Sequence, residues 1–329
     1  MLHSFIKYLL KNPVILALFL IGFIWFIVQI KTIIVSIFIS YIIMASVLPA
    51  VKFLQSKKFP KILAVLIPYL TIIIAIFLLI IPLVPFVVEQ LQSLIAKFPL
   101  FLDQTLKNFG LSINQKQITD YLTSQGSAIG SNAVNVTTHV FGGIFSVLTI
   151  FVVSFYLLMY HEAFKKFMAD MFHDGSREFV YSAMDQVNEK LGAWLRGEFV
   201  LMVFIGLFSW LGLTILGLPY ALPLALLAGL LEILPTIGPI VSAVPAVIVA
   251  FTISPTMALT VIVLYMLIQA LENQILVPKV MQKAVGLNPV IVILSIMIGA
   301  NLMGVAGALL AIPFVLFLKV LLSAFQSRN

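Results

Sequence analysis

Residues 219–254 read PYALPLALLAGLLEILPTIGPIVSAVPAVIVAFTIS, an almost wholly apolar stretch that prolines and glycines interrupt near its centre. A helix needs about 20 apolar residues to cross a bilayer. Each half of the stretch, about 221–233 and 240–252, is too short to cross alone. Irregular backbone at membrane depth is tolerated where protein or a water-filled cavity satisfies its polar groups. The stretch therefore predicts a re-entrant helical hairpin.

A second interrupted apolar stretch lies at 287–322, and its centre reads GANLMG from Gly299 to Gly304. An uninterrupted helix is expected between the two stretches, from about Thr256 to Val277. Two broken apolar segments in corresponding places indicate the binding site of a transporter. The alternative is that both stretches are kinked spans, which gives about eight transmembrane helices in place of about six plus two hairpins.

The composition excludes an ordinary soluble protein, because 62% of residues are hydrophobic and 9% are charged, against about 25% charged in soluble domains. An all-α polytopic membrane protein is expected. The chain has no cysteine, no P-loop, no nucleophile elbow and no zinc-protease histidine pair. We therefore expect no enzyme activity, no cofactor and no metal. The net charge of +7 indicates lysine-rich cytoplasmic loops and not nucleic-acid binding.

Hydropathy divides the chain into successive segments. These are the first three transmembrane helices at 1–88, an amphipathic and polar extracytoplasmic segment at 89–140, a fourth helix at 141–160, a cytoplasmic linker helix at 161–192, and a transport core at 193–329. The loop at 52–61 carries four lysines, whereas the much longer 89–140 carries three. Positively charged loops stay inside, so both termini are expected in the cytoplasm. This count also favours the hairpin interpretation, which leaves Lys279 and Lys283 cytoplasmic.

Few polar side chains lie at membrane depth, and ionisable ones there mark functional sites by default. Glu232 lies in the apolar stretch, three residues before Pro235. It is a candidate coupling carboxylate, and the alternative is a structural carboxyl that caps the turn. Gln269, Glu272 and Asn273 share one helix face and could line a polar path beside Glu232, or could form an ordinary interfacial helix end.

Three further polar residues complete the candidates. Asn301, in the second break, could bind a ligand or cap a broken helix. Arg196 and Glu198 form a charged pair at the start of the fifth span, where they could pair with each other or with lipid headgroups. The helix-break residues would bend the backbone and free carbonyl and amide groups for a ligand; they are Pro235, Gly238, Pro239, Gly299, Gly304 and Gly307.

Long ordered motifs over about 190–320 resemble the AI-2E family of bacterial transporters. They are GLPYAL (217–222), LLEILPTIGP (230–239), AVPA (243–246), QALENQILVP (269–278), VGLNP (285–289) and GVAGALLAIP (304–313). The resemblance implies a homo-oligomeric permease of the bacterial cytoplasmic (inner) membrane. The matching positions are Glu232, Pro235, Gly238, Pro239, Glu272, Pro278, Gly304 and Gly307. Glu198 departs from the pattern, which would have glutamine there.

The resemblance also implies a choice of functions, since family members are linked to export of autoinducer-2, and others to sodium (or lithium)/proton antiport. The primary hypothesis is a secondary transporter that exports a small polar metabolite, with autoinducer-2 as candidate. Its hydroxyl groups would suit Glu232, Gln269, Asn273 and Asn301. The second hypothesis is a monovalent cation/proton antiporter, in which Glu232 and Glu272 titrate. The third is an oligomeric pore or a non-transporting membrane scaffold.

Overall fold

The computed structural model describes residues 13–78, 143, 145–172, 177–235, 237–281 and 286–326, and every regular element in these ranges is helical. The expected all-α fold is confirmed. The helices are α2 (Pro13–Gln29), α3 (Lys31–Ser56), Lys61–Leu78, Phe145–Met159, α6 (His161–Asp170), α7 (Arg177–Ile215), α8 (Ala221–Leu231), α9 (Ile237–Phe251), α10 (Pro255–Leu271), the π-helical η2 (Glu272–Leu276), α11 (Val277–Met281) and α12 (Pro289–Gln326). The predicted segment 89–140 lies outside the described residues.

Several of these helices are long and apolar enough to cross a membrane, which confirms the polytopic architecture. The five that meet this condition are Lys31–Ser56, Lys61–Leu78, Arg177–Ile215, Pro255–Met281 and Val290–Ala324. Phe145–Met159 and α6, which meet at a bend of 75°, make a sixth if the pair is one span. α2 covers the predicted first span over 17 residues. Its large apolar side chains, such as Phe19 and Trp25, are exposed, as expected of a surface that faces lipid.

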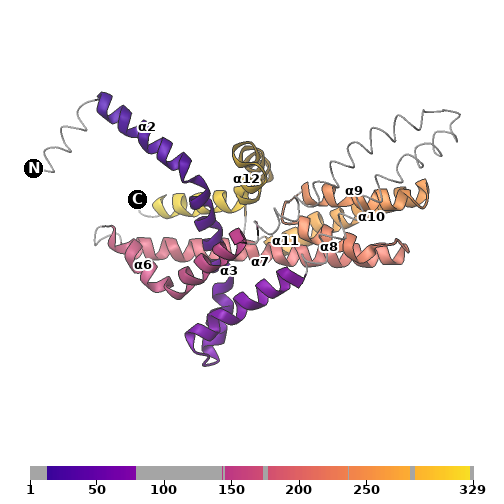
Figure 1. The fold of residues 1–329 in the computed structure, drawn as a ribbon, viewed down its shortest axis with the longest axis horizontal. Coiled ribbons are helices and arrows are strands. Elements are labelled where there is room, and N and C mark those ends of the chain that lie inside the picture. Colours follow the sequence, from indigo (N-terminus) through magenta and orange to yellow (C-terminus); the bar gives the residue numbers. More distant parts are fainter. Residues whose placement is uncertain are drawn as a thin grey trace, which may run out of the picture.

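The long helix α7 is the central element of the fold. It has 39 residues and packs against α3, α6, α8, α10, α11 and α12. Its polar first half and apolar second half form one continuous helix. Figure 1 shows α8, α9 and α10 gathered along the second half of α7, whereas α3 and α6 lie along the first half. The middle of α7 is therefore the place where the two groups of helices meet.

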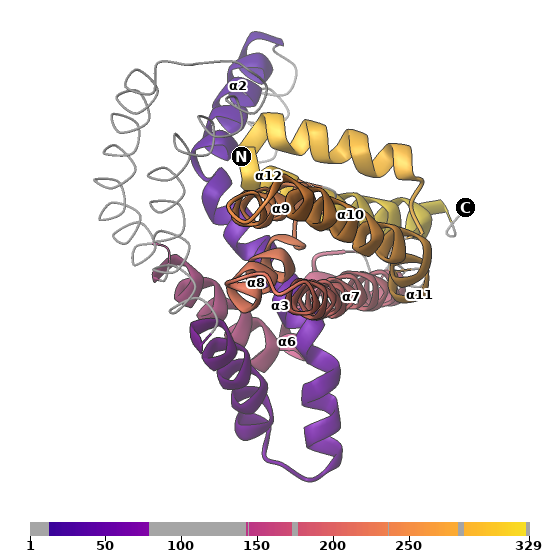
Figure 2. The same cartoon turned by 90° about the vertical axis from the view of Figure 1, so that its right-hand side faces the viewer.

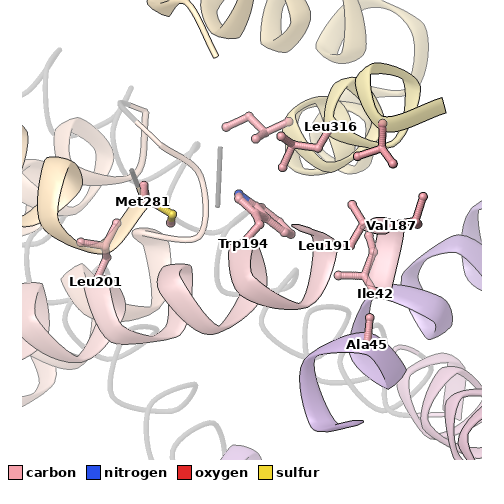
Figure 3. Close-up of a cluster of buried hydrophobic side chains, with 10 residues drawn as sticks. Ile42, Ala45, Val187, Leu191, Trp194, Leu201, Met281 and Leu316 are labelled. Carbon is pink, nitrogen blue, oxygen red and sulfur yellow. The ribbon is translucent and has the colours of Figure 1, made fainter. Parts of the chain in front are cut away.

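A buried apolar cluster fixes α7 against α3, α11 and α12. It includes Leu191, Trp194 and Leu201 of α7, with Met281 of α11 and Leu316 of α12. Figure 3 shows these side chains converging from the separate helices. Between membrane helices such side chains stabilise the contact by van der Waals packing, because lipid tails are as apolar as they are. The cluster therefore holds the middle of α7 in a defined position relative to the end of α11.

The stretch 219–254 forms the predicted hairpin. α8 has 11 residues and α9 has 15, so the arms are about 16 and 22 Å long at 1.5 Å per residue, less than the bilayer core of about 30 Å. α8 packs on α7 and on α9. The close approach of α8 to α7 depends on glycine, because a Cβ at Gly229 would lie 2.7 Å from the carbonyl oxygen of Met202 and 3.1 Å from the Cα of Gly206.

The helix expected at 256–277 is longer than predicted and changes its hydrogen bonding near its end. α10 runs from Pro255 to Leu271 and passes through the π-helical η2 into α11, which ends at Met281. In η2 the amide of Val277 donates to the carbonyl of Glu272, five residues earlier. Pro278 has no amide hydrogen to donate, which fits the widening of this turn. The expected helix is therefore confirmed as one continuous span, Pro255–Met281, which contains a π-helical turn at Glu272–Leu276.

The second interrupted stretch also folds back on itself. α12 changes direction at Met303 and Gly304, whose backbone leaves the helical region, with Gly304 at φ +60°. A Cβ at Gly299 would lie 2.3 Å from the carbonyl oxygen of Gly307, and one at Gly307 would lie 1.9 Å from that of Gly299. The two arms therefore touch backbone to backbone beside the bend, and Figure 2 shows them running in different directions.

Candidate functional site

Three buried glutamates meet where the hairpin turn, η2 and the middle of α7 converge. Glu232 follows the last residue of α8, Glu272 is the first residue of η2, and Glu198 lies on α7. Their side chains are 1%, 4% and 2% exposed, respectively. Carboxyl groups are almost never fully buried unless they are paired. The cluster of Glu198, Glu232 and Glu272, called here the carboxyl cluster, is the candidate functional site.

The carboxyl groups of Glu232 and Glu272 lie close enough to each other to share a hydrogen bond. Gln269, one turn earlier on α10, donates from Nε2 to Oε2 of Glu272 at 2.6 Å. Two carboxylates cannot hydrogen-bond to each other, because each only accepts. A hydrogen bond between the two carboxyl groups would need a proton on one of them, as in other carboxyl pairs that share a site.

Two oxygens of the carboxyl cluster have no hydrogen-bond partner among the described residues. They are Oε2 of Glu232 and Oε1 of Glu198. None of the three glutamates forms an ion pair within the described ranges. An ionised carboxylate buried without a partner is strongly unfavourable, so such a group takes up a proton or a ligand. In the same ranges, no group of three or more His, Cys, Asp or Glu side chains could hold a metal ion.

The turn between α8 and α9 places Glu232 by a short network of backbone hydrogen bonds. The amide of Gly238 donates to the carbonyl of Leu234 at 2.8 Å, and the amide of Ile237 donates to that of Pro235 at 2.8 Å. A Cβ at Gly238 would lie 1.8 Å from the carbonyl oxygen of Leu231. Only glycine fits against this carbonyl, which belongs to the residue before Glu232. Pro239 is buried in the first turn of α9.

The structure brings together some of the predicted site residues and leaves others apart. Glu232, Glu272 and Gln269 are in contact. The side chain of Asn273 is exposed, as is that of Asn301 on the first arm of α12, and no hydrogen bond joins either to the carboxyl cluster. The hydrogen-bonding set expected for a polyhydroxylated solute is therefore only partly assembled.

Arg196 and Glu198 are not an ion pair. Nη1 of Arg196 donates to the carbonyls of Ala45 and Ser46 on α3, at 3.3 and 3.1 Å. Pro49 has no amide hydrogen for the carbonyl four residues before it, so Ala45 needs this outside donor. Glu198, two residues after Arg196, lies instead in the carboxyl cluster. Of the two interpretations of these residues, the structure does not have the one in which they pair with each other, because Arg196 binds carbonyl oxygens of α3.

The sequence grouped Glu198 with Arg196 at the start of the fifth span, whereas the structure has it in the carboxyl cluster. Its helix face is a signal that could have found it, because Leu201, Ile205 and Ser209 follow it at helical spacing and all are buried. A second polar contact was missed, since Ser209 lies next to Tyr265 of α10. Both residues stand in strongly apolar helices, so composition alone gave them little weight.

Comparisons with known proteins give one matching family model and several relatives that are named as transport proteins or a permease. The family model described as "AI-2E family transporter" matches residues 14–327. YrrI of Bacillus subtilis (strain 168), named as a transport protein, is 27% identical over 329 residues, covering 93% of this chain and 91% of its own. A Thermotoga maritima protein, also named as a transport protein, is 25% identical over 83% of this chain and 82% of its own. PerM of Escherichia coli (strain K12), named as a permease, is 37% identical over 43% of this chain and 40% of its own. This chain is a multi-pass membrane protein that belongs to the AI-2E transporter family.

Proposed function

We propose that this chain is a secondary transporter of the bacterial cytoplasmic membrane that couples the export of a small polar metabolite to protons. Autoinducer-2 is the candidate solute. The observation that supports the proposal is the proximity of the buried carboxyl groups of Glu232 and Glu272, a pair that can hold one proton between them. A proton held at membrane depth between two helical elements is what a proton-coupled carrier needs.

The two fold-back elements support alternating access. The carboxyl cluster sits at the tip of the α8–α9 hairpin, whose arms are each too short to cross the membrane. Movement of this hairpin relative to α7 would expose Glu232 to one side or the other, as moving half-helices do in other carriers. Gln269, which donates to Glu272, would bind a hydroxyl group of the solute when that bond opens.

The proposed orientation in the membrane follows from the distribution of basic residues among the loops. Both termini lie in the cytoplasm, because the loop at 52–61 and the linker at 161–192 hold more basic residues for their length than 89–140. In this orientation the α8–α9 hairpin enters from outside, and Lys279 at the end of α11 is cytoplasmic. We also propose that copies of the chain assemble, with the exposed apolar surface of α2 against lipid or another copy.

Monovalent cation/proton antiport is the second candidate, and a different observation favours it. Two carboxyl oxygens of the cluster, on Glu232 and Glu198, have no protein partner. Carboxylate oxygens are ligands that hard cations accept, so a monovalent cation and a proton would compete for the same carboxyl groups. Alternate occupation by a cation and a proton is the basis of antiport.

The test uses the full chain in lipid vesicles with an imposed pH gradient. Autoinducer-2 flux and, separately, proton movement driven by sodium are recorded for the wild type, for Glu232→Gln and for Glu178→Gln. Glu178 is an exposed carboxylate of the same helix α7 and is the matched control. Flux that follows the pH gradient in the wild type and in Glu178→Gln, and that loses this dependence in Glu232→Gln, supports the proposal.

Two outcomes bear on the choice of function. Sodium-driven proton movement without autoinducer-2 flux supports the antiporter in place of the exporter. If Glu232→Gln leaves every gradient-dependent flux at the wild-type rate, proton coupling through this pair is wrong.

A further inference from the structure

Glu198 of the carboxyl cluster is almost fully buried beside α11. Its side chain is 2% exposed. At the preceding residue, a Cβ on Gly197 would lie 2.9 Å from Sδ of Met281, so α11 packs directly against α7 here. The next buried residue on the same face is Leu201. Glu198 therefore lies in a buried region where α7 packs against the α10–η2–α11 segment.

The groups that face Glu198 are acidic. It lies close enough to Glu272 of η2, and to Glu232 at the hairpin tip, to interact with both electrostatically. The neighbouring cation on α7, Arg196, donates to carbonyl oxygens of α3 and forms no ion pair with Glu198. Lys279 of α11 is exposed. Glu198 therefore receives no compensating positive charge from the described residues of the elements packed around it.

One oxygen of Glu198 is also without a hydrogen bond. Oε1 has no partner among the described residues, although the residue is almost fully buried. A purely structural glutamate would be expected to satisfy both oxygens, because an unmet buried acceptor costs about 1–3 kcal/mol. A glutamine would fill the same volume without adding a third acid to the cluster. The unpartnered Oε1 of Glu198 thus indicates a ligand that binds reversibly.

We propose that Glu198 is a third proton-binding group of the transport site, in addition to the Glu232–Glu272 pair. A proton from water binds the Glu198 carboxylate when the cluster is open to one side of the membrane, and the same proton leaves to water on the other side. The wild-type cycle therefore moves more protons than the pair alone would carry. This inference rests on the proposed function, since it assigns the proton stoichiometry of that same site.

The first test measures protonation directly and does not depend on transport. Infrared difference spectra of the full chain in lipid, recorded as the pH is stepped, report the stretch of protonated carboxyl groups. We expect Glu198→Gln to remove one titrating carboxyl band, and Glu198→Asp to retain a band because it keeps the carboxyl group. Glu178→Gln should leave the protonated-carboxyl bands unchanged, because that side chain is exposed on α7. An unchanged set of bands in Glu198→Gln overturns the proposal.

The second test measures stoichiometry in vesicles. The solute gradient that just balances an imposed pH gradient gives the number of protons moved per autoinducer-2 or per sodium. Glu198→Gln should lower that number while transport continues, whereas Glu198→Asp should restore it. An unchanged number in Glu198→Gln, together with lost coupling in Glu232→Gln, overturns the role of Glu198 and keeps the proposed function. If proton coupling is unchanged in both Glu198→Gln and Glu232→Gln, the role of Glu198 and the proposed function are both overturned.

Discussion

Substitution of Gly238 by alanine should disable the carboxyl cluster through a backbone shift of defined size. The added Cβ would lie 1.8 Å from the carbonyl oxygen of Leu231, and Cβ contacts under 3.0 Å are essentially never observed. The backbone must therefore move by at least about 1.2 Å, the difference between these distances. Leu231 precedes Glu232, so the shift is transmitted to the carboxyl group that contacts Glu272.

A displacement of this size exceeds what the site tolerates. Hydrogen bonds lie within about 2.5–3.2 Å, so a shift of about 1.2 Å breaks the contact between Glu232 and Glu272. Misplacement of a reacting group by about 1 Å can lower a rate about 100-fold. We expect Gly238→Ala to reduce gradient-dependent flux in vesicles by about this factor, and to lower stability by about 1–3 kcal/mol, as other overpacked sites do.

The matched control for this prediction is Gly206→Ala on α7. A Cβ there would lie 3.5 Å from the carbonyl oxygen of Ala225, which is ordinary contact, and alanine is the better helix former by about 1 kcal/mol. Flux is normalised to the protein that elutes as a single folded species. Wild-type flux in Gly238→Ala would refute the reasoning, and so would an equal loss in both variants.

Three further predictions concern the elements around the site. Arg196→Met should lower the free energy of unfolding in micelles by about 1.5–3 kcal/mol, because the carbonyl of Ala45 loses its donor. The loss should be smaller in a Pro49→Ala background, where the new amide of residue 49 can donate to that carbonyl. An equal loss in both backgrounds would contradict this account. Gly307→Ala should lower the thermal midpoint, because its Cβ would lie 1.9 Å from the carbonyl oxygen of Gly299 on the opposite arm of α12. An unchanged midpoint would argue against this backbone contact. Burial lowers the pKa of His161 on α6 from 6.5. The neutral imidazole therefore stabilises the fold above about pH 6.5, and this stability is lost as the pH falls below that value. If the thermal midpoint falls equally in the wild type and in His161→Gln, the loss belongs to other groups.

The carboxyl cluster contains three of the few acidic residues that lie outside the segments expected to orient the chain. Charged residues make up 9% of the sequence, and most of them lie in segments that orient the protein. Three of the remaining acids meet at one place although more than thirty residues separate each from the next. Acids placed within membrane-spanning segments are functional-site candidates by default, because an ionised side chain at mid-bilayer is unfavourable by about 2.5–3.5 kcal/mol on insertion scales.

The sequence alone was sufficient for the features that depend on neighbouring residues. Apolar runs of spanning length predict the helices, and these are present at Lys31–Ser56 and Arg177–Ile215. Proline and glycine spacing predicts the bends, and the chain folds back at 219–254 and at Gly304. Both signals are local, because helix formation depends on hydrogen bonds within four residues and proline removes one of them.

The tertiary structure decided which polar side chains meet, because that depends on contacts between helices distant in the sequence. The helical face that holds Gln269 and Glu272 predicted Asn273 as a third member, but the π-helical turn at Glu272 changes the spacing and Asn273 is exposed. Arg196 and Glu198, two residues apart, have different surroundings, because carbonyl oxygens of α3 accept from Arg196 whereas Glu198 is buried near Glu272 of η2. No sequence spacing encodes those choices, since each is set by the helix packed opposite.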